Sequence, residues 1–151
     1  MGSLLNPDDR RTILARIASV TPDSPRRWGR MSAHGMICHL TDAFAACMGD
    51  RPVTDRTNLV GRTFMRLVAN TLPVPWPKGI PTMPECDQEA DGTPPAEFKA
   101  DLNELLGTTQ AFVDRLDPAA MTHPVFGRMS AGERGRWGYR HLDHHARQFG
   151  L

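Results

Sequence analysis

The sequence predicts an all-α protein, and three observations support this prediction. Apolar residues recur at helical spacing in five segments, capping residues, prolines and glycines separate those segments, and no convincing period-2 alternation marks a strand. The 151 residues, of which 40% are hydrophobic and 23% charged, fit a single globular domain spanning residues 1–151. We therefore expect a bundle of four long helices plus one smaller element, joined in part by a long proline-rich connector.

The first two expected helices have clear start and stop signals. Asn6, followed by a proline and two acids, caps a helix of about residues 7–20. Ser32 caps a second helix that runs to about Met48 and ends at Gly49. The apolar stripe of the second helix contains a histidine and consists of Met36, His39, Leu40, Ala43, Phe44 and Cys47.

Three further segments also have helical periodicity. We expect a third helix over about residues 56–71 and a fourth over about residues 95–116. Ser130 and Glu133 form a capping box, which begins a fifth helix that runs to about Phe149 and ends at a glycine. The apolar stripes are Val60, Phe64, Leu67 and Val68 in the third helix and Phe98, Leu102, Leu105, Leu106, Phe112, Val113 and Leu116 in the fourth.

Between the third and fourth helices lies a proline-rich stretch. Seven of the thirteen prolines fall between Pro73 and Pro95. Because proline lacks a backbone donor and fixes φ, this stretch cannot form a regular helix or a central strand. An ordered loop of this length is typically functional or wraps the domain, and a plain extended connector is the alternative. Whether it forms a lid stays open.

The composition argues against several classes of protein. With 18 basic and 17 acidic residues the formal net charge is +1, so we expect no nucleic-acid partner. We expect the clustered arginines to lie on a solvated face or, alternatively, to bind carboxylates. No run approaches the roughly 18 apolar residues of a membrane span, and no signal peptide is visible. Three cysteines without a CxxC pair suit a reducing compartment. These features predict a cytoplasmic protein without a membrane partner.

The histidines suggest a site. His141 and His145 are four residues apart, so on a helix they lie on one face. His39 lies in the apolar stripe of the second helix, where a ring without a partner would be costly. If the two helices face each other, three neutral imidazoles converge, as in catalytic zinc sites, and nickel and ferrous iron also accept imidazole. The alternatives are hydrogen-bonded core histidines, or His144 in place of His141.

Two neighbours could complete such a site. Asp42 lies one turn after His39 and could orient its ring, and Trp137 lies one turn before His141. Trp137 is expected to line a substrate pocket or, as is more common for an aromatic residue, to belong to the core. If His141 and His145 are the pair, His144 lies beside the site.

The histidines lie in two stretches of distinctive sequence. The first is WGRMSAHGMICHLTDA at residues 28–43, and the second, at residues 123–150, ends in HLDHHARQFG. Both resemble the DinB-like superfamily, and more narrowly its DUF1569 branch, over almost the whole chain. The resemblance implies a four-helix bundle with a divalent metal ion, such as zinc, nickel, iron or manganese. One histidine of the second helix and an HxxxH pair of the last would hold it, which correspond here to His39, His141 and His145.

The resemblance also implies activities. Gln148 matches the family pattern one turn beyond His145, and we expect it to orient a ligand. Characterised relatives include metal-dependent thiol transferases and a thiol-dependent isomerase, which implies a low-molecular-weight thiol or water activated at the metal in a transferase or hydrolase. The expected partners are a small-molecule substrate or thiol, and a second copy in a homodimer. The alternative is a non-catalytic bundle whose histidines are structural and which binds a small ligand or partner.

Overall fold

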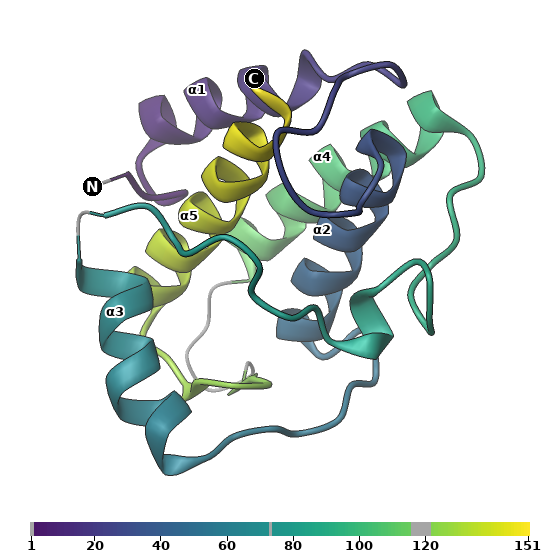
Figure 1. Cartoon of the computed structure of the whole chain (residues 1–151). Helices are drawn as coiled ribbons and strands as arrows, with labels where there is room; N and C mark the ends of the chain where they lie inside the picture. The colour runs from purple at the N-terminus through teal and green to yellow at the C-terminus, as the bar shows by residue number, and fades with distance from the viewer. Residues whose placement is uncertain (1, 73, 116–121) are drawn as a thin grey trace.

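The chain is mostly helical. The computed structural model describes residues 2–72, 74–115 and 122–151. No helix in these ranges is both long and apolar enough to cross a membrane. The elements, shown in Figure 1, are α1 (Pro7–Ala18), α2 (Ala33–Met48), a π-helical turn (Gly61–Met65), α3 (Arg66–Thr71), a 3₁₀ turn (Pro84–Cys86), α4 (Phe98–Asp114), β1 (Thr122–His123), β2 (Gly127–Arg128) and α5 (Ala131–Phe149).

The predicted helix caps are confirmed. The Asn6 side chain accepts hydrogen bonds from two backbone amides at the start of α1, and the Ser32 hydroxyl accepts one at the start of α2. Ser130 and Glu133 form the reciprocal capping box of α5. Gly49 and Gly150 end α2 and α5 with φ of 79° and 73°, where a residue without a Cβ is favoured.

The third helix begins later than expected. Helical structure starts at Leu59, not near residue 56, because the Arg56 amide donates to the Pro124 carbonyl and the Asn58 side chain caps the turn at the Gly61 amide.

Two further predictions differ from the structure: the start of the fourth helix and the absence of strands. The fourth helix begins at Phe98, not near residue 95, because the Glu97 carboxylate caps the amides that follow. Its expected end at Leu116 lies outside the described residues. The short antiparallel pair, in which Thr122 faces Arg128, was not predicted, because two-residue strands are too short to show alternation.

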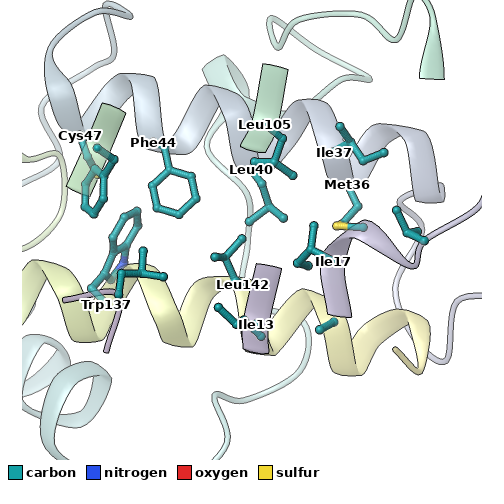
Figure 2. Packing of buried hydrophobic residues seen from close by; sticks show 14 of the residues in the cluster. Ile13, Ile17, Met36, Ile37, Leu40, Phe44, Cys47, Leu105, Trp137 and Leu142 are labelled. Carbon is teal, nitrogen blue, oxygen red and sulfur yellow. The ribbon is translucent and has the colours of Figure 1, made fainter. Parts of the chain in front are cut away.

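The core lies between α2 and α5, with α4 and α1 on its outer sides (Figure 1). Figure 2 shows side chains of α2 and α5 meeting along this seam, and Ile13 and Ile17 of α1 reach it from outside. At one end, the Phe44 ring packs against Phe112 and Trp137, at centroid distances of 4.9 and 5.7 Å. The seam between α2 and α5 therefore holds the faces on which the predicted histidines lie.

Polar contacts to α5 help to hold the π-helical turn and α3. Their apolar stripe does not pack into the core as expected: Phe64 is 66% exposed and Leu67 56% exposed. Arg66 makes two hydrogen bonds to the Glu133 carboxylate, and Arg136 of α5 donates to the Asn70 carbonyl near the end of α3. Apolar side chains of this segment are thereby left facing outward beside α5.

The expectation of a solvated arginine face is wrong for part of α5. Arg134 and Arg140 are buried. Arg134 donates to the Met129 carbonyl, and Arg140 donates to the carbonyls of Leu72 and Val74. These side chains tie the chain after α3 to α5, and this part of the proline-rich stretch then crosses in front of α5 towards α2 (Figure 1).

Candidate metal centre

Three histidines converge in the seam between α2 and α5. His39 comes from α2, and His141 and His145 come from successive turns of α5. Their candidate ligand nitrogens all lie within 4.8 Å of one another, and the Nε2 atoms of His39 and His141 are 3.1 Å apart. All three residues are buried, with exposures of 7 to 9%. The structure thus brings together the three residues that the sequence singled out.

Hydrogen bonds fix the tautomers of two of the rings. His39 Nδ1 lies 2.8 Å from the Cys86 carbonyl oxygen, which can only accept, so this nitrogen carries the proton. His145 Nδ1 lies 2.7 Å from Gln148 Oε1, and the Gln148 amide is itself oriented because its Nε2 donates to the Trp28 carbonyl. In the neutral form, both rings therefore present an Nε2 lone pair to the cluster.

The third ring is left incompletely bonded. Because His39 Nε2 carries no proton, the contact at 3.1 Å requires that His141 Nε2 donates to it. His141 Nδ1 is then unprotonated and buried, and no atom of the described residues makes a hydrogen bond to it. A buried polar nitrogen without a partner is destabilising.

Burial keeps the cluster uncharged. It lowers the pKa of His39, and it lowers the pKa of His141 and of His145 well below the usual value near 6.5. Repulsion between the rings lowers the pKa of His141 and His145 further, because a second positive charge would lie beside the first. The rings are therefore neutral at pH 7 and retain the lone pairs that a metal ion requires.

The donor set fits a divalent ion. Three neutral imidazole nitrogens, two of them oriented by a hydrogen bond from the opposite nitrogen, are typical of zinc and related metals. The buried Nδ1 of His141 has no hydrogen-bond partner among the described residues, so the protein alone leaves one nitrogen of the cluster unsatisfied.

An apolar cavity opens beside the histidines. It has a volume of about 420 Å³ and is bounded by α2, α5, the helical segment around α3, and the β1–β2 turn. Trp76 and Met83 of the proline-rich stretch form part of its wall, and His123 and Phe126 form another part. The proline-rich stretch therefore covers a hollow beside the candidate site.

A second hollow, of about 620 Å³, lies on the other side of His144. Its lining includes Arg27, Lys78 and Arg147. His144 and Trp76 line both hollows, and their rings lie 6.0 Å apart. His144 thus lies beside the histidine cluster, where the sequence placed it if His141 and His145 form the pair.

The other predicted neighbours have different positions. Trp137 packs in the core against Phe44 and also lines the cavity, with its ring 5.1 Å from that of His141. Gln148 bonds to His145. Asp42 does not orient the His39 ring through a hydrogen bond: the Cys86 carbonyl bonds that ring, whereas the Asp42 carboxylate accepts two hydrogen bonds from Thr93, at 2.8 and 2.7 Å.

The partners that sequence reasoning missed lie on loops. The Cys86 carbonyl, which holds His39, belongs to the 3₁₀ turn, and a backbone acceptor leaves no signal in side-chain patterns. Trp76, in the proline-rich stretch, was not predicted to line the site. A tryptophan in a loop indicates that the loop packs against the domain, so this residue could have been identified from the sequence. The Nδ1 atom of His123 accepts from the amides of Val125 and Phe126, which shapes the turn before α5.

The thiols near the site are not activated. Cys47 and Cys86 line the cavity, but burial raises the pKa of Cys86 to about 11 and raises that of Cys47 further. Both stay protonated at pH 7, and a thiol rather than a thiolate is a poor nucleophile. Buried, protonated thiols of this kind are typical of structural cysteines.

Comparisons with known proteins give one match. The sequence matches the family described as the DinB superfamily over residues 8–149. Searches of the curated proteins and of the solved structures returned no match. The matched range includes α2 and α5 and therefore all three histidines of the cluster.

Proposed function

Because the chain belongs to the DinB superfamily, we propose that His39, His141 and His145 bind a divalent metal ion and that the protein is a metal-dependent transferase or hydrolase. The observation that carries this proposal is the convergence of three neutral imidazoles, one of which has a buried nitrogen without a partner. A bound divalent ion supplies Lewis acidity, which lowers the pKa of a thiol or of water to near neutrality.

The protein's own residues position and protect the site. The Cys86 carbonyl and Gln148 hold the His39 and His145 rings so that their Nε2 atoms point to a common centre. Trp76 and Trp137 give the adjoining cavity part of its apolar lining. His144, whose pKa burial lowers, is a neutral base between the two hollows and can accept a proton from an incoming nucleophile.

Metal content is the decisive measurement. We expect about one divalent ion per chain in protein purified without an affinity tag, measured by mass spectrometry, and no ion in the double variant His39→Ala/His141→Ala. His34→Ala tests the other group of possible ligands, His34, Cys38 and Asp101, in which His34 lies 2.6 Å from the Asp101 carboxylate, and it should leave the metal content unchanged. A wild-type protein that takes up neither zinc, nickel, iron nor manganese would refute the proposal.

Activity is tested on the same proteins. A rate with thiol or water as the nucleophile should require the metal and be lost in His141→Ala. Activity that survives chelation would contradict the proposed chemistry, even if the metal were bound.

The finer family assignments are part of the same proposal. We propose that the chain belongs to the DUF1569 branch, has its four-helix bundle, and forms a homodimer in the cytoplasm. The apolar side chains exposed on and before α3, Phe64 and Leu67 among them, support a dimer because exposed apolar patches often mark interfaces. Sedimentation equilibrium tests it, and a monomer at all concentrations would exclude it.

A further inference from the structure

The cavity beside the histidines carries no formal charge. Among the described residues that line it, none is an aspartate, glutamate, lysine or arginine. The polar side chains of its wall are Thr82 and the histidines, and the rest of the wall is aliphatic, aromatic, proline or sulfur-containing. A charged group held against this wall, away from the histidine cluster, would lose its hydration without gaining an ionic partner, which is strongly unfavourable.

The shape of the cavity follows from the face of α2 that bears His39. Ala43 and Ala46 follow His39 on that face, at spacings of four and seven residues, and both line the cavity. Their small side chains leave space that Phe126 and Trp76 bound from other sides. The cavity is therefore an apolar chamber that ends at the histidine cluster.

The rim of the cavity is apolar as well. Phe64 of the π-helical turn and Ile80 of the proline-rich stretch both line the cavity, and they are 66% and 50% exposed. Apolar side chains at a rim attract an apolar molecule and give an ion nothing to bind. In contrast, the hollow on the far side of His144 has Arg27, Lys78 and Arg147 in its lining. The molecule thus separates an apolar compartment from a basic one.

We propose that the apolar cavity takes a neutral, largely apolar small molecule that carries a single donor atom, and that it excludes molecules that carry a charged group away from that atom. This proposal rests on the proposed function, since the donor atom would face the metal held by the histidine cluster. The volume of about 420 Å³ lies within the range of small-molecule sites. The substrate class is therefore a small apolar compound rather than a charged metabolite.

Two matched pairs of probes test the selectivity by isothermal titration calorimetry. Zinc-loaded protein is titrated with 4-phenylimidazole and with the same compound bearing a para-carboxylate on its phenyl ring. Metal-free protein is titrated with 2-methylnaphthalene and with 2-naphthoate. We expect the neutral probe of each pair to bind more tightly, by roughly tenfold or more, because the carboxylate would be desolvated without a partner.

A pair of variants localises the binding. Val68→Asp places a carboxylate in the wall of the cavity and should abolish binding of both neutral probes. Leu59→Asp is the control, because Leu59 lies on the same helical segment, is 77% exposed and does not line the cavity. It should bind both probes as the wild type does.

The outcomes separate the two proposals. Equal or tighter binding of the carboxylate probe, in either form of the wild-type protein, would overturn the inferred substrate class and leave the metal site intact. Failure to take up any of zinc, nickel, iron and manganese would overturn the proposed function, and the naphthalene pair would still decide whether the cavity selects neutral molecules. Because both comparisons use the wild-type protein, they stand even if Val68→Asp fails to fold.

Discussion

Gln148 links the histidine cluster to the loop before α2, and its replacement by alanine tests the site most directly. Its Oε1 accepts the proton of His145 Nδ1 at 2.7 Å, and its Nε2 donates to the Trp28 carbonyl at 3.1 Å. Gln148→Ala removes both bonds. The His145 ring then loses the contact that fixes its tautomer and aims its Nε2 at the cluster.

The size of the effect follows from these contacts. Groups that orient a ligand histidine through its other nitrogen typically contribute about 10–100-fold in metal affinity. This corresponds to about 1.4–2.7 kcal/mol. The buried Nδ1–H of His145, left without an acceptor, costs about 1–3 kcal/mol more, so the metal-free variant should also be less stable than the wild type.

A competition titration against a chromophoric chelator measures the zinc affinity. We expect Gln148→Ala to bind zinc about 10–100-fold more weakly than the wild type. Gln148→Glu is the control, because its carboxylate keeps an acceptor for His145 while losing the donor to Trp28, and its affinity should stay close to that of the wild type. An alanine variant that binds zinc as tightly as the wild type, or an alanine and a glutamate variant with equal losses, would refute this account of the site.

Two further predictions concern stability. Burial lowers the pKa of His123 to about 3 from an ordinary 6.5. Between these two pH values the unfolded chain binds a proton that the folded chain does not, so the free energy of unfolding is unaffected by this residue above pH 6.5 and decreases as the pH falls towards 3. Between pH 7 and pH 5 the wild type should lose about 2 kcal/mol more than His123→Asn, whose Oδ1 can replace Nδ1 as the acceptor. Urea unfolding at the two pH values measures this difference, and parallel losses would contradict it. Phe44→Ala, which empties a fully buried ring site between Phe112 and Trp137, should lower the free energy of unfolding by about 3–5 kcal/mol in the same assay, and a loss below about 1 kcal/mol would show that the site collapses.

The parts of the fold that the sequence predicted correctly depend on local chemistry. Asn6, Ser32 and the capping box of Ser130 mark helix starts because each side chain bonds to backbone only two or three residues away. Likewise, the spacing of His141 and His145 places them on one face of any helix.

The partners of the site could not be predicted in the same way, because they depend on contacts distant in sequence. His39 is bonded by the Cys86 carbonyl, 47 residues further along the chain, and no side-chain pattern specifies which carbonyl that is. Asp42 shows the converse error: its position one turn after His39 suggested contact with the ring, but Thr93, 51 residues away, holds its carboxylate. Helical spacing predicts which side chains share a face, and it does not show what that face meets.

Helical spacing also could not show what the apolar stripe before and within α3 contacts. A periodic run of apolar residues looks the same whether it packs against other side chains or lines a cavity, and Phe64 and Val68 do the latter. The distinguishing information lies on another helix, where Ala43 and Ala46 continue the face that bears His39 with side chains too small to fill the space opposite them. Larger residues at these two positions would fill space beside the histidines that the cavity now occupies. The pairing of a histidine with alanines four and seven residues later is therefore the feature of the sequence that turns a helix seam into a chamber.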